Sequence, residues 1–236
     1  GRHFPKLVGA KDMSKEVLRL SRELIRIPSI SRDEHKIAEF VFGRLDAWGQ
    51  QPRFIEVKDF GPSVMAEIGP SEAPAVVLNG HTDTVEVMSG WKHNPFRAIT
   101  DKGMLYGLGS LDMKCGLAEL MFAFKALAEI GLPGKGRVVL QAVSGEEISG
   151  AGTRALIAKG GFKRAQAAIV GEGFGGTGCL TIGRRGGSYF DVTVKGKAAH
   201  GSSPEDGVNA IVDAAAQISS KLGYKESGDR DRSGAD

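Results

Sequence analysis

The sequence predicts an α/β fold in which a mostly parallel, twisted sheet is flanked by helices. Short apolar runs alternate with longer amphipathic stretches, and ionisable residues follow directly after several of the apolar runs. This alternation of strand and helix is typical of a parallel sheet covered on its faces. The 236 residues are 41% hydrophobic and carry a net charge of +3, which excludes collagen, low-complexity disorder and disulfide scaffolds.

The first elements are predicted to be two amphipathic helices followed by short strands. Apolar residues recur at helical spacing over 17–27, where Pro28 ends the run, and again over 37–48, where Gly49 ends it. Strand-like runs follow at 53–57, 64–68 and 75–78. The last run is nearly all apolar, as expected for a strand buried on both faces.

A long helix is predicted next, from about Asp112 to Ile130, and Gly131-Leu132-Pro133-Gly134 ends it. A buried strand over 137–143, a helix over 151–159 and a strand over 167–170 follow.

The sequence changes in character after Gly171. Glycines crowd together up to Gly183, and residues 189–195 then alternate between polar and apolar, which predicts a strand of a second, antiparallel sheet. A helix over 208–222 and a charged tail follow. We therefore expect one domain over 1–182, a second over 183–222 and a disordered tail over 223–236.

Charge and cysteine content point to a cytoplasmic protein without nucleic-acid or membrane partners. The basic residues are scattered, and the first twelve residues lack the apolar core of a signal peptide. The apolar stretch 117–132 is interrupted by charged residues, so it predicts no transmembrane span. Cys115 and Cys179 are far apart and form no metal-type pair, which favours reduced thiols.

His81 is the first candidate site residue because it follows the predicted strand 75–78. Ligands of open α/β sheets bind beyond the carboxyl ends of the strands. Asp83, two residues on, would share a face with His81 and orient its imidazole, as carboxylates do behind metal-bound histidines. A lone His-x-Asp pattern is more often a hydrogen-bonded loop histidine.

Asp112 is the second candidate. Its place at the start of the predicted long helix fits an N-cap, whereas an anionic ligand for a divalent cation is the more specific interpretation. The glycine-rich segment 107–109, which precedes Asp112, lacks the G-x-x-x-x-G-K-[ST] pattern of a phosphate-binding loop.

Carboxylates follow the next two predicted strands, as Glu146 and Glu147 after 138–143 and Glu172 after 168–170. Adjacent carboxylates repel each other unless a cation lies near them. Taken singly, the Glu-Glu pair fits a solvated helix start and Glu172 fits a surface turn. Together with His81 and Asp112, they supply the nitrogen and oxygen donors of a hydrolytic metal site without cysteine.

These residues stand in stretches that resemble the M20 family of metallopeptidases and deacylases, which includes acetylornithine deacetylase, succinyl-diaminopimelate desuccinylase, aminoacylase and glutamate carboxypeptidase. The matching stretches are NGHTDTV at 79–85, LYGLGSLDMKCG at 105–116, SGEEISGAGT at 144–153, GEG at 171–173 and GKAAHGSSPEDGVNAI at 196–211. The resemblance runs from about Met13 to Ser220. It implies a zinc exopeptidase-like catalytic domain followed by an α+β lid and dimerisation domain.

The resemblance also implies the metal ligands. His81 would bind one zinc ion, with Asp83 behind it, and Glu172 would complete the protein ligands of that ion. Asp112 would bridge both ions and would often be followed by a cis peptide bond. Glu147 would bind the other ion. Two Zn²⁺ per complete site are implied, and Co²⁺ or Mn²⁺ would fit the same donors.

The implied reaction is hydrolysis of the amide bond of an N-acyl amino acid or small peptide. Glu146 would be the general base for a metal-activated water, and His200 would reach the partner subunit's site in a homodimer to stabilise the oxyanion. The residues do not identify the acyl group or the amino acid. Arg184 and Arg185 would suit a substrate carboxylate, although solvated hinge residues are the simpler interpretation.

One departure from the family pattern concerns the last histidine ligand, which family members carry near the C-terminus. No histidine follows His200, and the resemblance ends within the lid. We therefore interpret the chain as a C-terminally truncated member and expect it to have little or no activity. The alternative is a non-catalytic fragment or pseudoenzyme that only binds metal or dimerises.

Overall fold

The computed structural model describes residues 10–131, 136–173 and 191–221. The chain divides into two compact units between residues 181 and 182. Several predicted features lie outside the described residues. These are the expected boundary at 182–183, Cys179, the Arg184–Arg185 pair, residues 189–190 of the predicted strand, and the tail 223–236.

The first unit is built on a five-stranded sheet with the order β1-β2-β6-β3-β7. The strands are β1 (Arg53–Ile55), β2 (Ser63–Ile68), β3 (Ala75–His81), β6 (Arg137–Val143) and β7 (Ala165–Val170). β3 pairs in parallel with β6 and β7, whereas β2 is antiparallel to β6 and β1. Only β2 therefore runs against the others, and the predicted mostly parallel sheet is confirmed.

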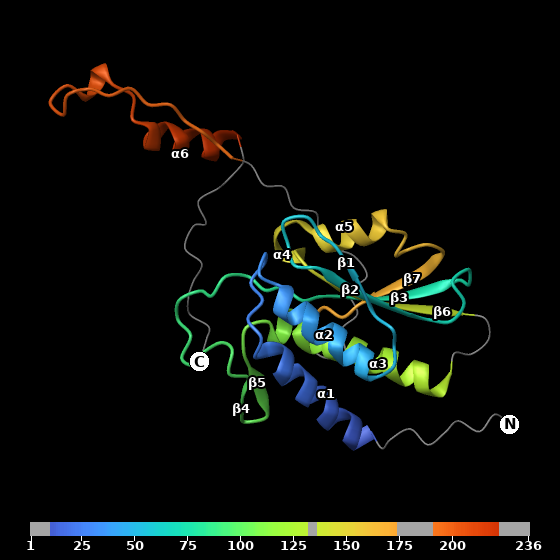
Figure 1. The fold of residues 1–236 in the computed structure, drawn as a ribbon. Helices are drawn as coiled ribbons and strands as arrows, with labels where there is room; N and C mark the ends of the chain where they lie inside the picture. Colours follow the sequence, from blue (N-terminus) through green and yellow to red (C-terminus); the bar gives the residue numbers. More distant parts are fainter. Residues whose placement is uncertain (1–9, 132–135, 174–190, 222–236) are drawn as a thin grey trace. The chain divides into compact units, whose positions relative to one another are not determined.

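Helices cover both faces of this sheet (Figure 1). The helices α1 (Ala10–Ile25), α2 (His35–Ala47) and α3 (Cys115–Ile130) lie on one face, and the short α4 (Glu146–Ser149) with α5 (Ala151–Ala158) lies on the other. These bounds agree with the two N-terminal helices and the helix after residue 150 that the sequence predicts.

Side chains of the central strands point alternately to the two faces of the sheet, and each face has its own hydrophobic core. Leu78 and Leu140 pack among α1, α2 and α3, whereas Val77 and Val139 pack with Leu156 of α5. Every residue of β6 is buried, including the polar Arg137 and Gln141, as predicted for a strand covered on both faces. Each fully buried Leu or Val contributes roughly 1.5–3 kcal/mol relative to exposure.

The strand predicted at 167–170 is confirmed as β7, which pairs with β3 alone among the described strands, and its Ile169 and Val170 are each 53% exposed. Two details of the first unit differ from the sequence prediction. A hairpin of β4 (Ile99–Asp101) and β5 (Met104–Tyr106) was not predicted, since three-residue strands are too short to show an alternating pattern. The predicted long helix begins at Cys115 instead of Asp112.

The second unit, as far as it is described, contains the 3₁₀ turn η2 (Pro204–Asp206) and the helix α6 (Ala210–Lys221), which confirms the predicted helix. Residues 191–195 form no strand, so that part of the prediction was wrong. An isolated antiparallel bridge joins Lys197 and Val208. A strand needs a hydrogen-bonding partner, and the described part of this unit places none beside residues 191–195.

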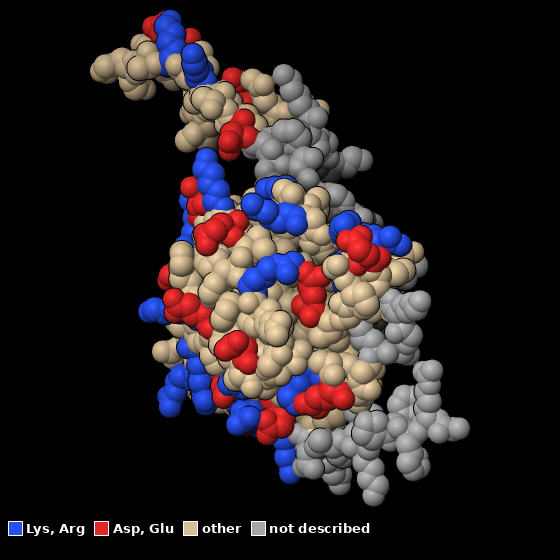
Figure 2. Space-filling view, turned by 45° about the vertical axis from the view of Figure 1, so that its right-hand side comes forward, with Lys and Arg blue, Asp and Glu red and all other residues tan. Residues whose placement is uncertain are grey.

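The surface of the molecule mixes both signs of charge. Lys and Arg side chains are interspersed with Asp and Glu over the face shown in Figure 2, so this face presents no continuous field of one sign. Within the ranges that the structure describes, no helix is long and apolar enough to cross a membrane.

A close backbone approach joins the start of α3 to the end of β7. A Cβ atom on Gly116 would lie 1.8 Å from the carbonyl oxygen of Gly171. A side chain at position 116 would fit only if α3 or the segment after β7 moved, so this contact requires glycine at position 116. It holds the segment that carries Asp112 beside the segment that carries Glu172.

We expect Gly116→Ala to lower the free energy of unfolding by about 1–3 kcal/mol, because the added methyl group overpacks two backbones. The control is Gly43→Ala in α2, where a Cβ atom meets nothing within 4 Å. This control should raise stability by roughly 0.5–1 kcal/mol through helix propensity. Urea unfolding followed by tryptophan fluorescence measures both, and equal effects would contradict the prediction.

Candidate metal centre

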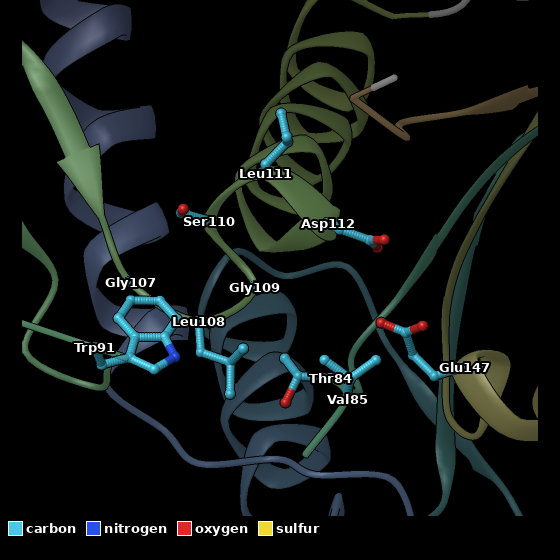
Figure 3. A pocket seen from close by; sticks show the side chains of 10 residues that line it. All are labelled: Thr84, Val85, Trp91, Gly107, Leu108, Gly109, Ser110, Leu111, Asp112 and Glu147. Atoms are coloured by element: carbon cyan, nitrogen blue, oxygen red, sulfur yellow. The ribbon is translucent and has the colours of Figure 1, made fainter. Parts of the chain in front are cut away.

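Three elements bring candidate ligands together at the carboxyl edge of the sheet. His81 is the last residue of β3, Asp112 lies in the turn η1 (Ser110–Lys114), and Glu147 is in the first turn of α4. One ligand atom from each of these three residues lies within 4.8 Å of the others. In Figure 3, the carboxylates of Asp112 and Glu147 point into the same space.

His81 is buried at the centre of this group. Its Nε2 lies 2.8 Å from Asp112 Oδ1 and 3.7 Å from Glu172 Oε1. Its Nδ1 lies 2.9 Å from the backbone carbonyl oxygen of Asp83, which can only accept, so Nδ1 carries a proton and donates. Nε2 is therefore the atom that faces the carboxylates.

The environment of His81 favours positive charge at Nε2. Burial alone would lower the pKa of His81, but hydrogen bonds to Asp112, Asp83 and Glu172 outweigh it and raise the pKa to about 12. The carboxylates thus stabilise a cation at this position. A proton and a divalent metal ion are the two cations that an imidazole Nε2 surrounded by carboxylates can hold.

Asp83 has a second role that the sequence did not indicate. Its carboxylate lies 3.5 Å from His81 Nδ1, and it accepts hydrogen bonds from the backbone N–H groups of Glu146 and Glu147 at 3.1 and 3.2 Å. Ser31 Oγ donates to the same carboxylate at 2.7 Å. Burial raises the pKa of Asp83, but the bonds with His81 and Ser31 outweigh it and lower the pKa. One buried carboxylate therefore links β3 to the start of α4.

The acidic pair at the start of α4 is shifted towards the protonated form. Burial, followed by repulsion from Asp112, raises the pKa of Glu147 to about 7. Burial also raises the pKa of Glu146, with smaller contributions from Glu172 and Asp83, while the positive charge of His81 opposes the shift. Carboxylates crowded in this way lose protons readily when a cation is placed among them.

Asp112 is neither an N-cap nor part of a helix. Its backbone is extended, with φ −119° and ψ 99°, so its side chain leaves the turn sideways towards His81. The peptide bond between Asp112 and Met113 is cis, as the resemblance implies. The N-cap interpretation was wrong because the chain becomes helical only at Cys115.

Two buried charged residues support the site and were missed by sequence reasoning. Glu34 accepts hydrogen bonds from the backbone N–H groups of Gly61 and Gly145, at 2.8 and 3.1 Å. Gly145, with φ +65°, directly precedes the acidic pair. Lys114 Nζ donates to the carbonyl oxygen of Ile27 at 2.8 Å, and burial lowers the pKa of Lys114 to about 7. In the sequence, the feature that could have indicated a buried Lys114 is its position as a charged residue directly before an apolar helix.

The structure does not bring every predicted residue into the cluster. The backbone of Glu146 is held by Asp83, but its side chain is not among the clustered ligand atoms and is only partly buried. His200 is exposed in the second unit, where its Nδ1 lies 2.8 Å from Ser202 Oγ. Its contribution to a partner subunit's site stays a prediction.

Comparisons with known proteins agree with this architecture. The family model described as peptidase family M20/M25/M40 matches residues 77–235. A probable succinyl-diaminopimelate desuccinylase of Staphylococcus epidermidis is 30% identical over 199 residues, which cover 84% of this chain and 48% of the relative. The chain thus spans about half the length of the curated relatives that it matches.

Solved structures with similar folds include an M20 family metallo-carboxypeptidase, Sso-CP2, from Sulfolobus solfataricus. It is 26% identical with a TM-score of 0.58, and the match covers 66% of this chain and 37% of that one. A dinuclear metal-binding peptidase from the M20 family of Bacillus subtilis is 20% identical with a TM-score of 0.51, covering 68% and 43% of the two chains. The second likeness shows the fold alone.

We expect Glu34→Gln to lower the free energy of unfolding by about 1–3 kcal/mol, because an amide NH₂ group then faces a buried backbone N–H. Glu39→Gln, on an exposed position of the following helix, is the matched control and should change stability by less than ~0.5 kcal/mol. Urea unfolding of both variants is the measurement. Identical losses in the two variants would show that the Glu34 carboxylate does not hold these loops.

Proposed function

Because the chain belongs to peptidase family M20/M25/M40, we propose that it is a metal-dependent hydrolase of the amide bond in N-acyl amino acids or small peptides. The observation that carries this proposal is the cluster of His81, Asp112 and Glu147 ligand atoms within 4.8 Å. One relative is named a desuccinylase and one solved neighbour a carboxypeptidase, so amide cleavage is the chemistry that we infer in common.

The residues present fit a pair of divalent ions. We assign His81 Nε2, Asp112 and Glu172 to one ion, and Asp112 and Glu147 to the other. The donors are imidazole nitrogen and carboxylate oxygen, the set that Zn²⁺ takes in hydrolytic sites, while Co²⁺ or Mn²⁺ fit the same donors. When bound, such ions polarise a carbonyl group and lower the pKa of water.

The protein's own groups would orient the ligands and move the proton. The carbonyl oxygen of Asp83 fixes the His81 ring so that Nε2 faces the carboxylates. The Asp83 carboxylate anchors the start of α4, which sets the position of Glu146. In our proposal, the Glu146 carboxylate takes a proton from the attacking water and delivers it to the leaving nitrogen. Burial raises the pKa of Glu146, which suits this exchange.

We further propose that residues 183–222 belong to a lid that also forms a homodimer. His200 would then donate a hydrogen bond to the developing oxyanion in the partner subunit's site. This assignment is supported by the family match, which extends through the second unit to residue 235. The same match supports a small acyl-amino-acid or peptide substrate.

Zinc stoichiometry and amidase rate on the purified chain test the proposal. We expect bound zinc and only weak turnover of an N-acyl amino acid, and Glu146→Gln should lower that kcat by roughly 10²–10⁴-fold with zinc content retained. Glu56→Gln, at an exposed loop position, is the control and should leave both quantities unchanged. Zinc binding without turnover across a broad N-acyl panel would favour the non-catalytic alternative, and absence of zinc binding would overturn the proposal.

A second measurement addresses His200. In the active protein, we expect His200→Asn to lower kcat by about 10²–10³-fold, the cost of losing one oxyanion donor. Zinc content should stay the same, because the residue is not assigned as a ligand. A loss of zinc in proportion to the loss of activity would refute the oxyanion role.

A further inference from the structure

A small cavity opens directly beside the candidate metal centre. Its volume is about 210 Å³, and Asp112 and Glu147 form one end of it (Figure 3). The remaining wall comes from the segment that follows β3 and from the chain that precedes Asp112. It is lined by Thr84, Val85, Trp91, Gly107, Leu108, Gly109, Ser110 and Leu111.

The wall away from the metal centre is mostly apolar, with Thr84 and Ser110 as its hydroxyl-bearing residues, and none of the residues described there is charged. Val85, Trp91 and Leu108 supply much of it, and no Lys or Arg is among the lining residues that the structure describes. Lys92 lines a separate cavity of about 460 Å³, which shares Trp91 but contains neither Asp112 nor Glu147. A negatively charged group bound against this wall would therefore be desolvated without a cationic side chain among the described lining residues to pair with it.

The shape of the cavity is fixed by backbone packing. Gly109 has φ +78°, and a Cβ atom there would lie 2.8 Å from Thr84 Cγ2. A Cβ atom on Gly107 would lie 2.4 Å from Ile25 Cγ2. The floor of the cavity thus lies close against Thr84 and against Ile25 at the end of α1, with no room for a side chain at either glycine.

The size of the cavity suits part of a ligand. Pockets that hold an entire drug-sized molecule measure ~300–1,000 Å³. A cavity below that range accommodates one side chain or one short acyl chain. Because its mouth lies at the carboxylates of Asp112 and Glu147, the group it holds must be attached close to the bond that the metal centre attacks.

We propose that this cavity is the subsite for a short, uncharged alkyl group next to the scissile amide. The substrate class is then N-acyl amino acids or peptides with an aliphatic group at that position, and a dicarboxylic acyl group is disfavoured there. This inference rests on the proposed function, since the metal centre is what places the scissile bond beside the cavity.

The test uses the zinc-loaded 236-residue chain and matched carboxylate probes. Acetate, pentanoate and glutarate each present one carboxylate to the metal, and glutarate differs from pentanoate by a second carboxylate in place of the terminal methyl group. Isothermal titration gives each Kd. One buried methylene strengthens binding by about fourfold, so pentanoate should bind at least tenfold more tightly than acetate or glutarate.

Two variants and a control test whether the preference for pentanoate over glutarate arises in this cavity. Trp91→Ala should weaken pentanoate binding about threefold or more and leave acetate binding unchanged. Val85→Arg adds a cation at a half-exposed lining position and should reverse the preference in favour of glutarate. Ile157→Arg, at an exposed position of α5 that does not line the cavity, should leave the pentanoate-to-glutarate ratio unchanged.

The outcomes separate the two proposals. A chain that binds no zinc overturns the proposed function, and the subsite assignment with it. A zinc-loaded chain that binds glutarate as tightly as pentanoate, or whose pentanoate affinity is unaffected by Trp91→Ala, overturns the subsite assignment alone. The fold-changes predicted above support it.

Discussion

The arrangement of the site depends on the buried carboxylate of Asp83. It lies against the His81 imidazole and accepts hydrogen bonds from the first two backbone N–H groups of α4 and from Ser31. Residues from three separate parts of the chain are fixed relative to one another by this single side chain. Because a buried carboxylate is costly unless it is fully hydrogen-bonded, the same bonds that stabilise Asp83 also define the positions of His81 and the acidic pair.

The sheet supplies the frame within which this carboxylate acts. β3, β6 and β7 run in parallel, so the residues that follow them emerge at one edge. The contact between Gly116 and Gly171 then brings the start of α3 against the end of β7. Packing at these two glycines, which lie in the same segments as Asp112 and Glu172, therefore places both carboxylates near the same imidazole.

The site combines strong local charge with an apolar neighbour. Carboxylates surround one imidazole, and burial together with repulsion from Asp112 raises the pKa of Glu147 to about 7, which prepares the cluster to exchange protons for metal ions. The cavity beside it has no positive charge among its described lining residues. In the proposed hydrolase, this contrast would separate two tasks, because the charged edge would hold the ions that activate water and the apolar wall would select the substrate.

Much of this protein was determined by the sequence alone. Local periodicity predicted the main helices and strands, and the ends of these elements indicated His81, Asp83, Asp112, Glu147 and Glu172 as candidate site residues. The tertiary structure decided what depends on contacts between distant segments. Glu34 bonds to Gly145 across 111 residues, β7 is exposed because it lies at the sheet edge, and Asp83 caps a helix that begins 63 residues later. Such contacts leave no trace in local periodicity, because they are set by packing and not by the neighbours of a residue along the chain.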